Sequence, residues 1–208
     1  MRIGVLALQG DFALHAGALA RCGVESVEVR KPDALEAVDG LIIPGGESTT
    51  LLRLMEHWGL VPAIEGLHRE GRPIFGTCAG LILLAREVLN PRQFSLGLID
   101  VSVERNAYGR QRESFEARGV AVFDGRPSEI ELVFIRAPRI RELGPGVEVL
   151  ARLNAEPVLV QQDTVLVAAF HPELTDDPTV HQYFCRMVWR TRPERAPKPS
   201  LSPKAGCG

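Results

Sequence analysis

The stretch Pro73-Ile-Phe-Gly-Thr-Cys-Ala-Gly-Leu81 places a cysteine between two glycines, where an apolar strand-like run gives way to a helix-like one. The glycines permit a tight strand-to-helix turn that projects the side chain of Cys78 from the carboxyl edge of a sheet. The N–H groups of the following helix then favour the thiolate. This pattern predicts a nucleophilic Cys78, with the backbone N–H of Ala79 placed to help hold an oxyanion.

A second segment supplies the groups that a nucleophilic thiol requires. His171-Pro-Glu173 follows the apolar run Val165–Phe170, so His171 lies at the end of a predicted strand, where open α/β sheets gather functional groups. In an extended segment residues two apart face the same way, so Glu173 can reach a ring nitrogen of His171. We therefore predict a nucleophile, a base and an orienting carboxylate in Cys78, His171 and Glu173. Inert thiols are expected at Cys22, Cys185 and Cys207, and solvated surface histidines at His15, His57, His68 and His181.

The order of strand-like and helix-like segments predicts a layered α/β fold. The first half alternates the two types, which implies a parallel sheet covered on both faces. The second half has closely spaced strand candidates, which suggest antiparallel additions and hairpins at one edge. Predicted strands are Ile3–Leu8, Ser26–Val29, Gly40–Ile43, Pro73–Phe75, Val101–Glu104, Glu116–Val122, Glu131–Ile135, Val147–Leu153, Pro157–Gln161 and Val165–Ala169. Predicted helices are one with a stripe of Phe12, Ala16, Leu19 and Ala20, one over Thr49–His57 capped by Ser48, and those over Pro62–Glu70, Leu81–Val88 and Pro178–Arg190.

Composition narrows the class of protein. At 208 residues and 45% hydrophobic, the chain suits one globular domain, which we place at residues 1–190, with a Pro- and Arg-rich tail at 191–208 expected to lack fixed structure. A net charge of −2 gives no support for nucleic-acid binding. No run approaches the about 18 apolar residues of a membrane helix. The four cysteines form no CxxC pair, which argues against a zinc site and for a reducing, cytoplasmic setting.

A glycine turn, Pro44-Gly-Gly-Glu-Ser-Thr-Thr50, joins another predicted strand to a helix. It lacks the spacing of a phosphate-binding P-loop. We interpret it as the source of a second oxyanion donor, the backbone N–H of Gly45 or Gly46, with a simple connecting turn as the alternative.

These motifs together resemble those of the class I glutamine amidotransferases, and within them the family of glutaminase subunits of pyridoxal 5'-phosphate synthase. Tyr108 and the segment Phe12–His15 depart from the family pattern without touching the predicted triad. The resemblance spans about Met1–Arg190 and is carried by Gly4–Gly10, Pro44–Thr50, Gly76–Gly80, Arg105–Gln111, Ser114–Glu116, Phe134–Pro138 and His171–Thr175.

The resemblance implies a class I amidotransferase-like, flavodoxin-like fold and the hydrolysis of L-glutamine to glutamate and ammonia through a Cys78 thioester. It implies glutamine contacts at Gly46, Glu47, Ser48, Arg105, Ile135 and Arg136, an oxyanion hole at Gly46 and Ala79, and no metal or cofactor. The implied partner is a (β/α)8-barrel synthase subunit in a large hetero-oligomer. Two alternatives stay open: a glutaminase serving another synthase, such as imidazole glycerol phosphate synthase, and a non-catalytic regulatory subunit.

Overall fold

A large sheet runs through the centre of the molecule. The computed structural model describes residues 1–105 and 114–192, and within them nine strands pair in the order β2-β1-β3-β4-β12-β11-β10-β7-β8. The first five are parallel, and the other four join antiparallel. The prediction of a parallel sheet with antiparallel additions at one edge is confirmed. The strands are β1 (Arg2–Leu6), β2 (Glu25–Val29), β3 (Gly40–Ile43), β4 (Ile74–Thr77), β7 (Ser114–Phe123), β8 (Arg126–Ile135), β10 (Glu148–Leu153), β11 (Glu156–Gln162) and β12 (Val165–Ala168).

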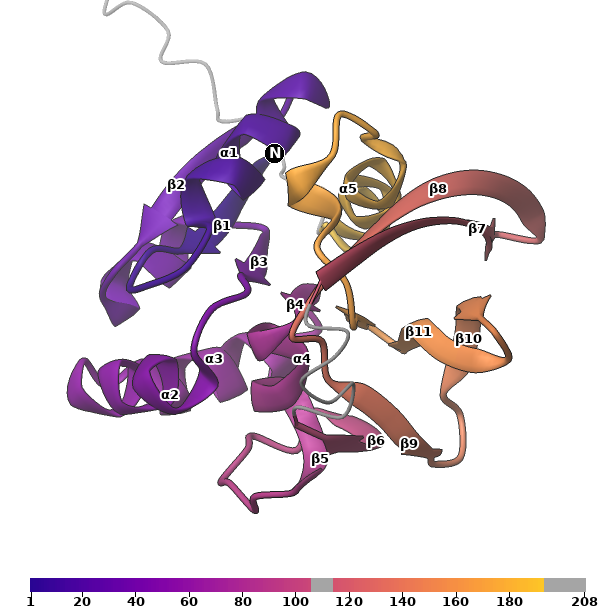
Figure 1. Cartoon of the computed structure of the whole chain (residues 1–208). Helices are drawn as coiled ribbons and strands as arrows, with labels where there is room; N and C mark the ends of the chain where they lie inside the picture. Colours follow the sequence, from indigo (N-terminus) through magenta and orange to yellow (C-terminus); the bar gives the residue numbers. More distant parts are fainter. Residues whose placement is uncertain (106–113, 193–208) are drawn as a thin grey trace, which may run out of the picture.

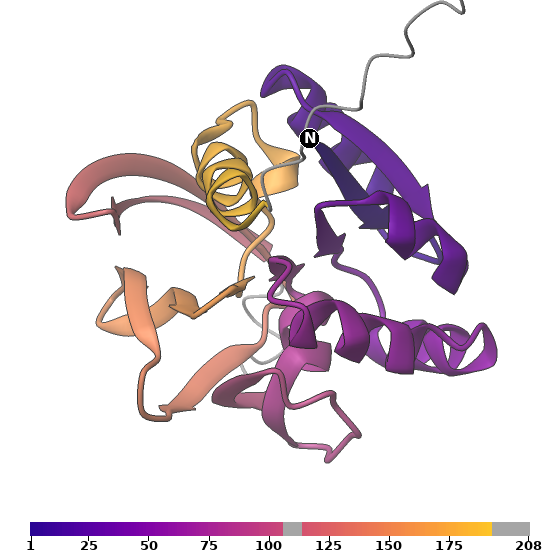
Figure 2. The same ribbon diagram turned by 180° about the vertical axis from the view of Figure 1, so that it is seen from behind.

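Helices cover both faces of the parallel part of this sheet, as the alternation predicts. Figures 1 and 2 show α1 (Phe12–Arg21) and α5 (Thr179–Thr191) on one face, and α2 (Ser48–His57), α3 (Leu60–Arg69) and α4 (Ala79–Leu84) on the other. In the described part of the chain, two short 3-10 helices, η1 (Pro32–Ala37) and η2 (Pro172–Leu174), also connect the strands and helices. The three-layer arrangement is therefore confirmed.

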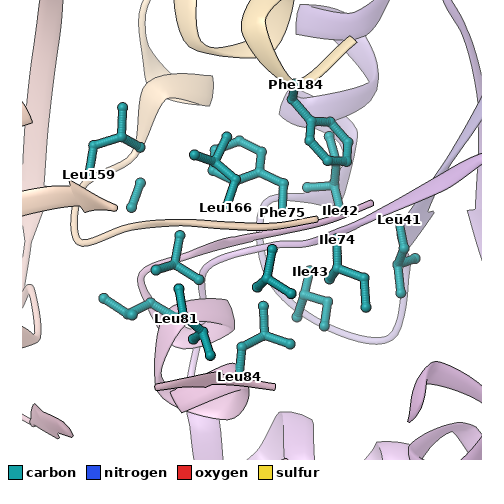
Figure 3. Packing of buried hydrophobic residues seen from close by; sticks show 14 of the residues in the cluster. Leu41, Ile42, Ile43, Ile74, Phe75, Leu81, Leu84, Leu159, Leu166 and Phe184 are labelled. Atoms are coloured by element: carbon teal, nitrogen blue, oxygen red, sulfur yellow. The ribbon is translucent and has the colours of Figure 1, made fainter. Parts of the chain in front are cut away.

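The core is centred on strands β3, β4 and β12, which are buried along their whole lengths. Such strands are apolar at consecutive positions because both of their faces are covered. Phe75 points toward Phe184 of α5, with ring centroids 5.5 Å apart, while Leu81 and Leu84 of α4 pack on the opposite side of the sheet (Figure 3). The carboxyl ends of these three strands meet at one edge, and that edge carries the site described below.

The buried stripe of α1 differs from the predicted one. Ala20 is exposed, whereas His15, Ala18 and Leu19 are buried. His15 and His181 of α5 are both fully buried, so the expectation that they are solvated is wrong, while His57 is exposed as expected. The burial of these two histidines was not predicted because their hydrogen-bond partners come from other elements, which the pattern of a single helix cannot show.

A second, smaller sheet replaces the end of one predicted helix. The helix predicted over Leu81–Val88 is wrong after Leu84, because the chain is extended at Ala85 and continues as β5 (Ala85–Leu89). This strand pairs in parallel with β6 (Ile99–Glu104), which pairs antiparallel with β9 (Arg139–Leu143). The run Leu81–Ala85 is buried throughout and has no polar face, so its periodicity did not mark where the helix ends.

The predicted domain boundary at residue 190 and the predicted tail at 191–208 can be compared with the structure only in part. The boundary predicted at residue 190 falls in the last turn of α5, and Arg192 still reaches Asp39, with Nε 3.6 Å from Oδ1. Most of the predicted tail, with Cys207, lies outside the described residues, as do Tyr108 and most of the Arg105–Gln111 segment. Among the helices that the structure describes, none is long and apolar enough to cross a membrane.

Candidate active site

The turn between β4 and α4 presents Cys78 in a strained conformation. Cys78 has φ 48° and ψ −98°, a positive φ that a residue with a side chain rarely adopts. The glycines around it are required by close packing. A Cβ atom on Gly80 would lie 2.2 Å from the carbonyl oxygen of Ile43, and one on Gly76 would lie 2.6 Å from the carbonyl carbon of Gly80. This is the predicted elbow, although the helix that follows has only six residues.

His171 and Glu173 meet in the loop that follows β12. The Nδ1 atom of His171 lies 2.8 Å from Oε1 of Glu173, and both residues are almost fully buried. The backbone N–H of His171 donates to the carbonyl of Val133 in β8, 2.8 Å away, so the edge hairpin anchors the loop. Because Nδ1 is engaged by the carboxylate, Nε2 is the ring nitrogen left for the thiol.

The electrostatics of this dyad favour an ion pair. Burial alone would lower the pKa of His171, but the Cys78 sulfur and the Glu173 carboxylate outweigh it and raise that pKa to about 10. Burial alone would also raise the pKa of Glu173, yet the neighbouring histidines His15 and His171 hold it well below its usual range. The site therefore contains an ionised Glu173 beside an imidazole that readily holds two protons.

The glycine turn packs directly against the dyad. A Cβ atom on Gly45 would lie 2.4 Å from Cε1 of His171 and 3.5 Å from Cβ of Cys78. The carbonyl oxygen of Gly45 approaches Gly10 so closely that a Cβ there would lie 1.8 Å away. Gly46 has a φ of 146°, and the next backbone N–H, that of Glu47, donates to Oε1 of Gln9 at 3.1 Å. These contacts hold the turn at the mouth of the site, where the oxyanion prediction requires it.

A cavity of about 380 Å³ opens over the thiol. It brings all six predicted glutamine contacts together with Cys78 and His171, although they come from five separate segments of the chain. Glu173 and Ala79 do not line it. Sequence reasoning missed three of its residues. The lining comprises Gln9, Asp11, Gly46, Glu47, Ser48, Cys78, Ile82, Arg105, Ile135, Arg136 and His171. Gln9 and Asp11 come shortly after β1, just as His171 comes shortly after β12. Their position after a parallel strand is the sequence signal that could have identified them as site residues.

Glu47 has a structural task in addition to its place in the cavity. Its carboxylate accepts hydrogen bonds from the backbone N–H groups of Thr49 (3.0 Å) and Thr50 (2.7 Å), so Glu47 caps α2 and the prediction of Ser48 as the cap is wrong. Ser48 instead donates to Oε1 of Gln93. Burial opposes the charge of Glu47, but these donors lower its pKa to about 2. Arg105 approaches the same carboxylate at 3.4 Å.

Within the described residues, one group of side chains lies close enough together to hold a metal ion, and we assign no metal centre to it. Asp11, His171 and Glu173 bring ligand atoms within 4.8 Å of one another. The closest of these atoms already form the hydrogen bond between His171 and Glu173, which suits an orienting dyad. Cys185 is buried and Cys22 half-buried, and both are away from the cavity.

Comparison with known proteins gives one consistent family. The family model described as "SNO glutamine amidotransferase family" matches residues 5–190. A "Pyridoxal 5'-phosphate synthase subunit PdxT" from Thermosipho africanus is 52% identical over 188 residues, covering 90% of this chain and 99% of the relative. A protein of the same name from Thermus thermophilus is 54% identical over 192 residues, covering 89% and 97%.

Solved structures agree on the architecture. A structure described as "Crystal structure of glutamine amidotransferase" superposes with a TM-score of 0.84 and 51% identity, covering 90% of this chain and 98% of the other. The structure of PurLQS from Thermotoga maritima superposes with a TM-score of 0.65 at 17% identity, covering 91% and 96%. At that identity the second likeness concerns the fold alone.

Proposed function

Because the chain belongs to the SNO glutamine amidotransferase family, we propose that it hydrolyses L-glutamine and delivers the ammonia to a synthase subunit that makes pyridoxal 5'-phosphate. The observation that carries the proposal is the cavity in which Cys78 and His171 meet the six predicted glutamine contacts. The names of the relatives favour this synthase over the imidazole glycerol phosphate alternative. The intact triad argues against a non-catalytic subunit.

The proposed reaction uses the thiolate–imidazolium pair. Cys78 Sγ attacks the side-chain amide carbon of glutamine, and the resulting oxyanion is held by the backbone N–H groups of Gly46 and Ala79. His171 Nε2 gives its proton to the leaving nitrogen, so ammonia departs and a γ-glutamyl thioester remains. His171 then takes a proton from water, which attacks the thioester and releases glutamate. Throughout, Glu173 holds the tautomer of His171 and stabilises its positive charge.

The cavity offers charges of both signs for the α-substituents of glutamine. We assign the α-ammonium to the ionised carboxylate of Glu47, and the α-carboxylate to Arg105 or Arg136. Ser48 and Ile135 complete the proposed contacts, the first through its hydroxyl and the second beside the thiol. The carbonyl oxygen of Ile135 lies 4.0 Å from Cys78 Sγ. Truncating Glu47 also removes the cap of α2, so glutamine affinity is best tested through the arginines.

Delivery of ammonia requires a docked partner. Ammonia released into water at neutral pH would be protonated and would lose its nucleophilicity. We therefore propose that the synthase subunit is a (β/α)8 barrel, that it docks at the edge carrying α1 and the active-site loops, and that the complex is a large cytoplasmic hetero-oligomer. Residues 1–190 form the glutaminase domain in this proposal.

The deciding experiment compares nitrogen sources in the complex with the synthase subunit. We expect Cys78→Ala to abolish glutamate release and glutamine-dependent pyridoxal phosphate formation, and to leave product formation from added ammonium chloride intact. Cys22→Ala serves as the matched control, because it removes a half-buried thiol outside the cavity. Near-normal glutamate release by Cys78→Ala would refute the assignment of the nucleophile.

A second expectation concerns coupling between the subunits. Glycines flank the peptide between Gly45 and Gly46, so no side chain of these two residues restricts its dihedral angles, and its N–H can point away from the oxyanion site in a free subunit whose turn is arranged differently. Losing one such donor costs on the order of 10²–10³ in rate. We expect the isolated chain to be a poor glutaminase that the synthase subunit activates. Equal activity at saturating glutamine with and without the partner would show that the hole is already formed.

A further inference from the structure

Two buried histidines, His15 and His181, belong to the same polar cluster as Glu173 but do not line the cavity. The Nε2 atom of His15 in α1 is 3.1 Å from Oγ1 of Thr77 and 3.4 Å from Oε2 of Glu173, so the expectation that the segment Phe12–His15 does not touch the triad is wrong. The Nδ1 atom of His15 is 3.0 Å from Nε2 of His181 in α5. A continuous chain of polar side chains therefore runs from α5 through α1 to the dyad of Glu173 and His171.

The protons in this chain can be assigned from the partners of each nitrogen. Burial, followed by the nearby His15, lowers the pKa of His181 to about 3, so His181 is neutral at pH 7 and has one N–H. Its Nδ1 atom makes no hydrogen bond to the described residues. A buried N–H without a partner is rarer than a buried unpaired acceptor, so the proton belongs on Nε2, which donates to Nδ1 of His15. Nε2 of His15 must then carry a proton, and it faces Thr77 and Glu173.

The two carboxylate oxygens of Glu173 thus face different histidines. Oε1 is bonded to His171, whereas Oε2 has no conventional hydrogen bond within the described part of the chain and has His15 Nε2 beside it at 3.4 Å. A buried ionised oxygen without a donor is costly. Among the groups that lower the pKa of Glu173, His15 acts more strongly than His171. A space-filling role alone would not require a ring nitrogen beside this carboxylate oxygen.

We propose that His15 is a positioning residue, whose Nε2–H holds Oε2 of Glu173 so that this carboxylate stays ionised and Oε1 remains directed at His171. The inference deepens the proposed function and rests on the roles assigned there to Cys78 and His171. His15 would act only through Glu173, since it does not line the cavity. His181 in turn fixes which nitrogen of His15 carries the proton.

The proposal predicts a change in the pH dependence of the thiol. The titratable groups around the Glu173 carboxylate are His171, His15 and, near the cavity mouth, Asp11, while Arg21 adds positive charge near His181. If the donor at His15 is lost, Glu173 takes up a proton at higher pH, and a neutral Glu173 no longer supports the imidazolium beside Cys78. The reactivity of Cys78 falls at low pH, where its thiolate is lost, and we call this fall the acid limb. The acid limb then moves to higher pH. A hydrogen bond to a charged group corresponds to a shift of about one to two pH units.

Two amide substitutions separate this role from packing. The side-chain nitrogen of His15→Gln can occupy the place of Nε2 and keep the donor to Glu173, whereas that of His15→Asn falls near Nδ1 and loses it. Iodoacetamide alkylation of Cys78, followed by peptide mass spectrometry across pH 2 to 9, reports the thiolate without using glutamine. A failure of the proposed glutaminase function would therefore not affect this measurement.

We expect the acid limb of His15→Asn to move up by about one to two pH units and that of His15→Gln to stay near the wild type. A merely structural role would reduce the amount of folded protein in both variants and leave the limb in place. If the variants fold poorly, the unmodified protein decides the question, because NMR of ¹⁵N-imidazole-labelled protein shows whether His15 Nε2 is protonated. Unmoved limbs in both variants, equal shifts in both, or an unprotonated Nε2 would each overturn the proposal.

Discussion

Replacing Gly45 with alanine tests how tightly the glycine turn sets the position of the catalytic histidine. The new Cβ would lie 2.4 Å from Cε1 and 2.9 Å from Nδ1 of His171. Ordinary van der Waals contact begins near 3.4 Å, so the ring or the turn must yield by about 1 Å. The ring has little room to retreat, because Glu173 holds its Nδ1 at 2.8 Å and Val133 holds its backbone N–H.

The expected consequence is a loss of rate with the fold retained. A displacement of about 1 Å in a reacting group can reduce the rate by about 10²-fold, which corresponds to about 3 kcal/mol of transition-state stabilisation. Gly45 does not have a positive φ, so alanine adds no backbone strain at this position. We therefore expect kcat for glutamate release to fall by about two orders of magnitude. The overpacked site should also lower the free energy of unfolding by about 1–3 kcal/mol, which leaves the chain folded at the assay temperature.

The assay measures glutamate release at saturating glutamine and saturating synthase subunit, with circular dichroism to follow unfolding. Gly66→Ala in α3 is the matched control, because its Cβ would meet nothing nearer than Nη2 of Arg69 at 3.9 Å and alanine favours the helix. Wild-type kcat in Gly45→Ala would refute the idea that the turn and the imidazole are packed without slack.

Three further predictions follow from the same contacts. Glu173→Gln should retain more activity than His171→Asn in the glutamate assay, because it disturbs the orientation and charge of the base but leaves the base in place. His181→Gln should make the protein less sensitive to acid. The unfolded chain binds a proton at this position below about pH 6.5, whereas the folded chain does not until about pH 3, so wild-type stability falls as pH drops. Between pH 7 and 5 this difference is about 2 kcal/mol, measured by urea unfolding. Gly80→Ala should lower the free energy of unfolding by about 1–3 kcal/mol, because its Cβ would lie 2.2 Å from the Ile43 carbonyl oxygen.

Each of these has a clear contrary result. Equal inactivity of well-folded Glu173→Gln and His171→Asn would show that the carboxylate does more than orient the base. An unchanged pH dependence of unfolding in His181→Gln would show that His181 is protonated in the folded chain. For Gly80→Ala, an unchanged urea midpoint would mean that the elbow and β3 can separate without cost.

Local sequence was sufficient for the alternation of elements and for the elbow. Strands β3, β4 and β12 are short apolar runs because both of their faces are buried. Such a run can be recognised from residue types alone. The glycines beside Cys78 and the turn at Gly45 mark places where only a residue without a side chain can fit. His171 and Glu173 could be paired because they are only two residues apart. The extended segment on which that prediction relied is absent, since Pro172–Leu174 form a 3-10 helix that brings the carboxylate to the ring.

Tertiary structure decided everything that depends on partners from distant segments. His15 and His181 lie on the apolar stripes of their helices, but only the packing of α1 and α5 beside Glu173 makes their burial tolerable, because each supplies the other with a hydrogen-bond partner. The cavity likewise assembles six separate segments, and β5 is extended because it pairs with β6. Periodicity indicates which face of an element is buried, whereas only the neighbouring elements determine what that face meets.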